Sequence, residues 1–258
     1  MKKFFALLLI LVFSFTLLGA NAAEKKKKVR KPKTKTKIEF EAKDGFLLVG
    51  DLYFSPQRKP PCPLVILLHS FGSKSSDWGN LGETLRLKNY NVLALDLRGH
   101  GKSVYTKNLR FKSRMNFEKE DWVKYPIDVV SSIDYIKKNY PQINTDEIYL
   151  VGADLGANSA VLAASIMKNK PKKMVLISPY VSFKNLDIAL VVPKLTTVPM
   201  MVMASRADRY SYSQSDIIYR LIHSQKVLKL YDEGGSGNLL LKRNPSSYDE
   251  IAKYISGK

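Results

Sequence analysis

The sequence predicts an α/β protein with a mostly parallel, eight-stranded sheet flanked by helices. Strand and helix signals alternate along most of the chain, which is the pattern of parallel strands joined by crossover helices. Several strand signals are unbroken apolar runs, such as residues 64–68, as expected for strands that are buried on both faces. The chain has 258 residues, of which 45% are hydrophobic, and is long enough to bury a core of this size.

The first 22 residues have the features of a signal peptide. Two lysines precede an apolar run over residues 4–18, and residues 20–22 read Ala-Asn-Ala, a small-x-small cleavage pattern. Cleavage there predicts an exported protein of the periplasm, the cell envelope or the extracellular space. The alternative is an uncleaved membrane anchor, because more Lys and Arg residues follow the apolar run than precede it.

Residues 23–37 are predicted to form a basic, disordered tether. Nine Lys or Arg residues lie between Lys25 and Lys37, and Val29 is the one aliphatic side chain in that stretch. Such a segment cannot bury a core, but it can contact anionic surfaces of the cell envelope. The alternative is a solubilising linker. No module for sequence-specific recognition of nucleic acid accompanies the basic stretch, so we expect none to be bound.

The domain is expected to occupy residues 38–258, with the following elements in its first half. Residues 37–42 and 46–54 predict an antiparallel pair of strands that turns at residues 43–45. The apolar runs at residues 64–68 and 91–97 predict two buried strands. Between them, residues 77–87 predict a helix with Ser76 as its N-cap.

The second half continues the alternation. Apolar residues at three- and four-residue spacing predict a long amphipathic helix over residues 122–139. The remaining strands are predicted at 147–151, 174–177, 200–204 and 227–231, and the remaining helices at 155–167, 213–223 and 248–255. Residues 179–199 leave room for a minimal lid.

Three short motifs stand where predicted strands end. They read His-Ser-Phe-Gly at residues 69–72, Asp-Leu-Arg-Gly-His-Gly-Lys-Ser at 96–103 and Gly-Ala-Asp-Leu-Gly at 152–156. Together they resemble the α/β hydrolases, especially serine aminopeptidase-like and small esterase-like members. The resemblance implies the α/β-hydrolase fold, a nucleophile elbow at residues 152–156, and an oxyanion hole made by the backbone amides of Phe71 and Leu155.

No cofactor or metal is expected. Gly101-Lys102-Ser103 mimics the end of a phosphate-binding loop, but that motif requires glycine where this chain has Asp96. No His, Cys and Asp cluster has the spacing of metal ligands. Cys62 is the single cysteine, so the chain cannot form an internal disulfide.

The resemblance implies a degenerate catalytic triad. Asp154 stands at the nucleophile position, where these hydrolases have serine. Asp208 follows a predicted strand and matches the acid. Ser236 stands near the position of the histidine, and the three histidines of the chain lie elsewhere, at His69, His100 and His223.

This pattern leaves three hypotheses. The first is a non-catalytic protein that binds a small-molecule or peptide ligand, or a partner, in the cell envelope. The second is an active hydrolase of the ester, peptide or Asp-nucleophile type with a rearranged site, in which Asp154 is served by His69 or by a water held by Ser236. The third is an adaptor whose basic tether binds acidic polymers or nucleic acid, while the domain is a passive body.

Overall fold

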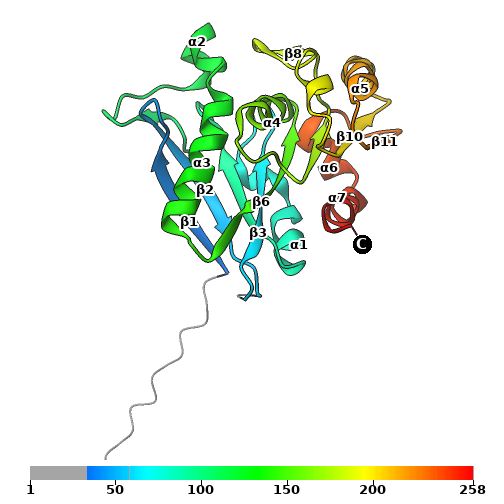
Figure 1. Ribbon diagram of the computed structural model, residues 1–258. Helices are drawn as coiled ribbons and strands as arrows, with labels where there is room; N and C mark the ends of the chain where they lie inside the picture. Colours follow the sequence, from blue (N-terminus) through cyan, green and yellow to red (C-terminus); the bar gives the residue numbers. More distant parts are fainter. Residues whose placement is uncertain (1–33, 58, 258) are drawn as a thin grey trace, which may run out of the picture. The chain divides into compact units, whose positions relative to one another are not determined.

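The computed structural model describes residues 34–57 and 59–257, so the predicted signal peptide and residues 23–33 of the predicted tether lie outside the described residues. A central sheet with helices on both of its faces makes up the described part (Figure 1). Its strands are β1 (Lys35–Glu41), β2 (Phe46–Tyr53), β3 (Cys62–Leu68), β4 (Asn91–Asp96), β5 (Tyr105–Thr106), β6 (Ile143–Ala153), β7 (Lys173–Ile177), β10 (Met200–Ser205) and β11 (Lys226–Tyr231).

The strand order is β1-β2-β4-β3-β6-β7-β10-β11, and the short strand β5 pairs with β2. Strand β2 is antiparallel to both β1 and β4, whereas every pair from β4 to β11 is parallel. The predicted mostly parallel, eight-stranded sheet is therefore confirmed, with β5 as a short addition. In this arrangement the carboxyl ends of the parallel strands meet at one end of the domain, where ligands of such sheets usually bind.

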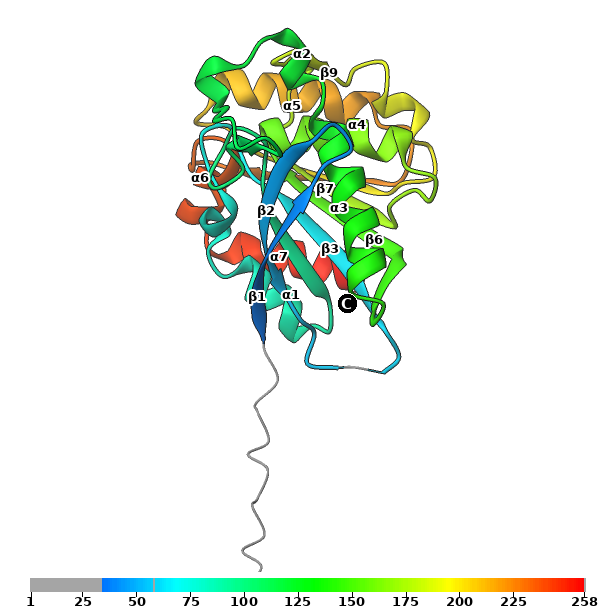
Figure 2. The same cartoon turned by 90° about the vertical axis from the view of Figure 1, so that its left-hand side faces the viewer.

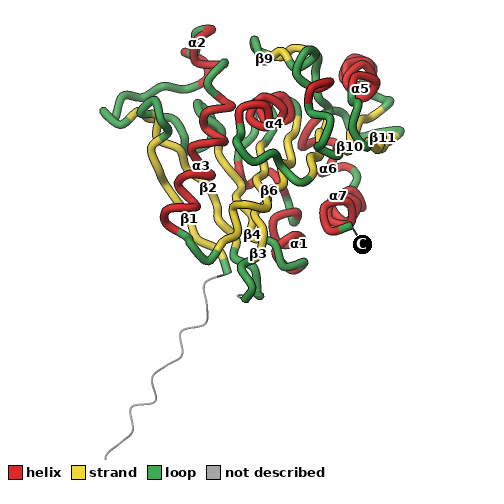
Figure 3. Tube along the Cα trace, viewed as in Figure 1, coloured by secondary structure: helices red, strands yellow, loops and turns green. Residues whose placement is uncertain are grey.

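Seven α-helices accompany the sheet in the described residues (Figure 3). They are α1 (Leu81–Leu87), α2 (Lys119–Trp122), α3 (Tyr125–Asn139), α4 (Leu155–Ile166), α5 (Arg209–Leu221), α6 (Gly237–Arg243) and α7 (Ser246–Ser256). Within the part of the chain that the structure describes, no helix combines the length and the apolar character that a membrane span requires.

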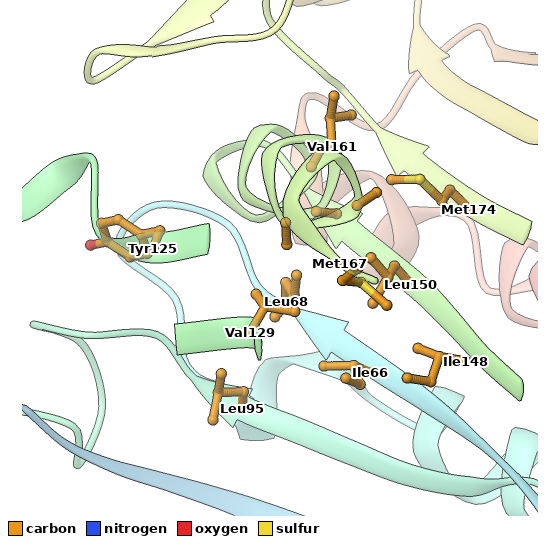
Figure 4. Packing of buried hydrophobic residues seen from close by; sticks show 14 of the residues in the cluster. Ile66, Leu68, Leu95, Tyr125, Val129, Ile148, Leu150, Val161, Met167 and Met174 are labelled. Carbon is orange, nitrogen blue, oxygen red and sulfur yellow. The ribbon is translucent and has the colours of Figure 1, made fainter. Parts of the chain in front are cut away.

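The core has two halves, one on each face of the sheet. Leu64, Ile66 and Leu68 of β3 pack on the side of α3 and α4, and Figure 4 shows Ile66 and Leu68 beside Val129 of α3. The intervening residues of β3 pack on the other side, with α1, α6 and α7. This alternation explains the unbroken apolar run, because both faces of the strand are covered.

Strand β1 begins at Lys35, inside the stretch that was predicted to be a tether. The boundary of the tether at residue 37 is therefore wrong. Lys35 pairs in register with Tyr53 of β2, and its ammonium lies 2.9 Å from the Asp51 carboxylate. Backbone pairing on an edge strand does not require apolar side chains, so the basic composition hid the start of the strand.

Three helix predictions need correction. The helix expected over 77–87 starts at Leu81, because Gly79 adopts a φ of 53° and interrupts the turn before it. The helix expected over 122–139 starts at Tyr125, as α3, and the separate short helix α2 ends at Trp122, where the prediction began. Pro126 lies in the first turn of α3, where its missing N–H costs nothing. Helix α6 was not predicted, because Gly234, Gly235 and Gly237 are typical of a loop.

The segment after β7 is short, as predicted for a minimal lid. It holds a small hairpin made of β8 (Ser182–Phe183) and β9 (Leu186–Asp187), followed by one turn of 3-10 helix at Val192–Lys194. Figures 1 and 2 both show this hairpin and α2 at the same end of the domain. Both elements thus stand at the end where the parallel strands finish.

Candidate functional site

Asp154 sits on a sharp turn between β6 and α4. Its backbone has φ 53° and ψ −114°, outside the regions that most residues adopt. The turn is tight because Gly152 and Gly156 have no side chains: a Cβ on Gly156 would collide with the Leu68 carbonyl, and one on Gly152 with the Gly156 carbonyl. The strand-turn-helix geometry expected of residues 152–156 is therefore present.

The Asp154 carboxylate is buried, with 9% of the residue exposed. Its Oδ2 accepts a hydrogen bond from the Phe71 N–H at 3.3 Å, and its Oδ1 has no hydrogen-bond partner among the described residues. Burial raises the pKa of Asp154 to about 7, the Phe71 and Leu155 amides oppose that rise, and the charge of Asp208 adds to it. Near neutral pH, the carboxyl group is thus divided between its protonated and ionised forms.

Asp208 begins helix α5 as its N-cap. Its Oδ1 accepts the Ser211 N–H at 3.0 Å, and the residue is half-buried. Its carboxylate is near enough to raise the pKa of Asp154 by charge repulsion. The structure therefore brings Asp208 close to the elbow, while one of its oxygens serves as a helix cap.

Ser236 lies directly before α6, at the N-cap position of that helix. Its side chain interacts with the hydroxyl of Tyr180, whose pKa is raised to about 12 by burial and then by the charges of Asp154 and Asp208. Ser236, Tyr180 and the two aspartates therefore share one environment.

No histidine contacts Asp154 among the described hydrogen bonds, and the environments of the three explain why. In His69, Nδ1 lies 2.8 Å from the Ser70 carbonyl and Nε2 accepts the Leu97 N–H at 3.0 Å, so both ring nitrogens are engaged. Burial lowers the pKa of His69 to about 4, so the ring is neutral. The version of the rearranged-site hypothesis in which His69 is the base does not fit this geometry.

His100 and His223 are also poorly suited to act as a base for Asp154. The Nδ1 of His100 lies 2.9 Å from the Arg98 carbonyl, and burial together with the nearby His69 lowers the pKa of His100 to about 3. His223 is exposed and follows α5, whose 13 residues extend about 20 Å from Asp208. The Nε2 of His100 is buried and has no hydrogen-bond partner among the described residues, but its low pKa makes this imidazole a weak base. No described hydrogen bond joins any of the three imidazoles to the elbow.

The turn at residues 96–103 is a scaffold for this end of the sheet. The Asp96 carboxylate accepts the N–H groups of Ser75 at 2.6 Å and Lys102 at 2.8 Å. The buried Arg98 side chain bonds to Asp128 of α3, and also to Asp44 at 2.8 Å. These bonds hold the turn against the loops on either side of it.

A contact between Ser70 and the start of α6 closes the site on one side. The Ser70 N–H donates to Asn238 Oδ1, and the Asn238 N–H donates to Ser70 Oγ, both at 2.8 Å. Gly237, which precedes Asn238, lies so close to the loop after β3 that a Cβ on it would collide with Ser70 Oγ and touch Asp154. Ser70 stands where the related motif has glycine, and this difference was the one sign in the sequence of an additional contact. That the partner of Ser70 is Asn238 could not be predicted from the sequence.

A model of the family described as "Serine aminopeptidase, S33" matches residues 59–234, more than half of the chain and a range that includes the elbow and Asp208. The chain belongs to the serine aminopeptidase S33 family. The resemblance to α/β hydrolases that the three motifs indicated is thereby confirmed.

Two relatives of this S33 family member are named monoglyceride lipases. The monoglyceride lipase homolog of Monkeypox virus is 30% identical over 163 residues, which are 62% of this chain and 52% of that protein. The monoglyceride lipase of Mus musculus is 30% identical over 129 residues, 50% of this chain and 38% of that protein. The chain thus matches about half, or less, of the length of these relatives.

Two of the solved structures with the same fold are esterases of low sequence identity. The chain is similar to an esterase from Pyrococcus furiosus, with a TM-score of 0.68 and 18% identity, over 86% of this chain and 91% of that chain. An esterase from Exiguobacterium antarcticum has a TM-score of 0.65 and 15% identity, over 84% and 98%. These similarities establish the α/β-hydrolase fold and leave the chemistry to the site itself.

Proposed function

We propose that this S33 family member is non-catalytic and binds a small-molecule or peptide ligand in front of Asp154. One observation carries the proposal: the Asp154 carboxylate accepts the Phe71 N–H, the amide that would otherwise stabilise an oxyanion. The side chain at the nucleophile position therefore occupies the place where a tetrahedral intermediate would need its donors.

The chemistry of Asp154 supports the same conclusion. A carboxylate that attacked an ester would form an anhydride, and water would then need a base in order to release it. Neither ring nitrogen of His69 is available for that step, and the pKa of His100 is about 3. The loss of a general base alone typically reduces a rate by about 10² to 10⁴, and an anion in the oxyanion hole adds to that loss.

The names of the relatives suggest a first ligand to examine. Because one of them is named a monoglyceride lipase and the other a monoglyceride lipase homolog, we propose that the site retains affinity for molecules that carry an acyl chain. The aromatic side chains around Phe71, which include Trp122 and Phe183, support such a ligand because they present apolar surface beside the elbow.

The test is hydrolysis of a short-chain chromogenic ester by the purified protein, measured beside Asp154→Asn. We expect no turnover above the buffer rate in either protein, and saturable binding of monododecanoylglycerol by the wild type without release of dodecanoate. Turnover by the wild type that Asp154→Asn abolishes would overturn the proposal.

That overturning result would favour the second candidate, an active hydrolase in which Asp154 acts as a base or nucleophile. Its support is the pKa of Asp154, which at about 7 is suited to exchanging a proton near neutral pH. Burial and the proximity of Asp208 produce that value.

We also propose that the protein is exported and that its basic segment contacts anionic envelope surfaces. The support is the signal-like pattern of residues 1–22 and the run of basic residues that follows it. Mass spectrometry of the mature protein is expected to show Ala23 as its first residue, whereas a chain that retains residue 1 would contradict export with cleavage. Deletion of residues 24–33, which leaves β1 intact, is expected to abolish binding to anionic vesicles.

A further inference from the structure

Three aromatic side chains from different segments cluster near the elbow, and we refer to Phe71, Trp122 and Phe183 as the aromatic rim. Phe71 is exposed and Phe183 half-buried, whereas Trp122 is buried beneath them. The Phe71 ring lies 6.1 Å from the Trp122 ring and 5.8 Å from the Phe183 ring, measured between centroids. Phe71 is 37% exposed, and its own N–H reaches the Asp154 carboxylate. Phe71 therefore has an exposed ring and a backbone amide that contacts the site.

Two cationic side chains converge on this rim. The Arg114 guanidinium lies 5.5 Å from the centre of the Phe71 ring. The Lys184 ammonium lies 5.3 Å from the same ring and 5.4 Å from the Trp122 ring. The two side chains come from segments far apart in the sequence. Arg114 lies just before α2, and Lys184 lies in the turn of the β8–β9 hairpin.

The backbone holds both cations in place. The Arg114 N–H donates to the Gly99 carbonyl at 3.1 Å, which ties it to the scaffold turn. Lys184 and Asn185 form the hairpin turn with φ values of 51° and 63°. Positive φ at both central residues is typical of a type I′ hairpin turn, in which lysine is an unfavourable choice compared with Gly or Asn.

Neither cation forms an ion pair with a described residue. None of the ion pairs within residues 34–57 and 59–257 includes Arg114 or Lys184. The Arg114 Nε is buried and has no hydrogen-bond partner among the described residues. By contrast, the nearby Lys112 is paired with Asp121 at 2.5 Å. A buried donor without a partner is costly, and an anion from a ligand would satisfy it.

We propose that Arg114 and Lys184 form a binding site for the anionic head group of an amphiphile whose acyl chain lies against the aromatic rim. This rests on the proposed function, because it names the class of ligand that the same site binds. The head group carries a single negative centre, a carboxylate or a phosphate, beside Phe71. The acyl chain packs on the rings, and the negative head group pairs with the two cations, which form no ion pair with a described residue.

The test compares dodecanoate with monododecanoylglycerol, which has the same chain and no charge, by calorimetry below their critical micelle concentrations. For dodecanoate, Arg114→Gln and Lys184→Gln are each expected to weaken binding roughly tenfold or more. Neither variant is expected to change the affinity for monododecanoylglycerol by more than about twofold. Dodecyl phosphate in place of dodecanoate shows which of the two head groups binds more tightly.

Lys226→Gln is the matched control, because Lys226 also lies over an aromatic ring, that of Tyr219 at 4.7 Å, but at the start of β11. It is expected to bind dodecanoate as the wild type does. Equal affinity of the wild type and both rim variants for dodecanoate would overturn the inference, as would the absence of dodecanoate binding. Ester hydrolysis by the wild type would instead overturn the non-catalytic function while leaving the selectivity for anions standing.

Discussion

Ser70 and Asn238 are 168 residues apart in the chain and exchange two hydrogen bonds of 2.8 Å each. The pair joins the loop after β3 to the first turn of α6, and Gly237 lies between this contact and Asp154. Ser70 takes the place of a glycine in the motif that the resemblance identified. The Ser70 hydroxyl accepts the Asn238 N–H and so holds the first turn of α6 against the site.

This contact predicts a measurable loss of stability when either partner is truncated. Ser70→Ala leaves the Asn238 N–H without its acceptor, and Asn238→Ala does the same to the Ser70 N–H. Each is expected to lower the free energy of unfolding by about 1 to 3 kcal/mol in urea titrations. Ser165→Ala, at an exposed serine on α4, is the control and is expected to cost less than about 0.5 kcal/mol. An effect of Ser70→Ala as small as that of the control would contradict the role of the pair.

The buried carboxyl of Asp154 predicts a specific pH dependence of stability. Its pKa in the folded protein, about 7, lies above the ordinary value of 3.8, so the folded state prefers the protonated form. The stabilisation from that proton is complete below about pH 4 and is lost as the pH rises through 7. The difference corresponds to roughly 4 kcal/mol.

Asp154→Asn removes this titration. Between pH 4 and 8, the free energy of unfolding of Asp154→Asn is therefore expected to change less than that of the wild type. The difference between the two proteins is expected to reach up to roughly 4 kcal/mol. Asn tolerates the positive φ of the elbow, so the backbone is expected to remain as it is. Unfolding of both proteins followed by circular dichroism at several pH values provides the measurement, and parallel curves would show that Asp154 is ionised at low pH.

Restoring serine at the elbow is not expected to restore catalysis. Asp154→Ser reintroduces the attacking group of the family, but both nitrogens of His69 are engaged and His100, with a pKa of about 3, is a weak base. We expect no adduct with a fluorophosphonate probe in intact-mass spectra and no ester turnover. Rapid covalent labelling of Asp154→Ser, with the wild type unlabelled, would reveal a base that the described geometry does not contain.

The ion pair of Arg98 and Asp128 predicts a large cost at a residue far from the elbow in sequence. Both side chains are almost fully buried, so Asp128→Ala leaves a buried cation with Asp44 as its remaining partner. The expected loss is about 3 to 5 kcal/mol in the free energy of unfolding. Asp134→Ala, on the same helix but in an exposed pair with Lys43, is expected to cost less than about 1 kcal/mol. Similar losses for both variants would contradict this account.

Elements that depend on local pattern could be predicted well. The buried strands β3 and β4 are apolar runs, and β7, β10 and β11 each start within one residue of the prediction and end within one residue of it. Strand β6, by contrast, starts at Ile143, four residues before the predicted start. Elements whose local pattern misleads could not be predicted. The glycines before and within α6 indicate a loop, and the helix forms because Leu240 and Leu241 are buried against the sheet and Asn238 docks on Ser70.

The sequence by itself determined the fold, the elbow and the identity of the residue on it, because these follow from the order of apolar runs, the spacing of glycines and the type of one side chain. Only the tertiary structure decided how Asp154 is ionised, which amide it meets, that both nitrogens of His69 are engaged, and that Arg114 and Lys184 meet at one ring. The reason is physical. Backbone preferences act over a few residues, whereas burial, charge and hydrogen bonding depend on segments that come together only when the chain folds.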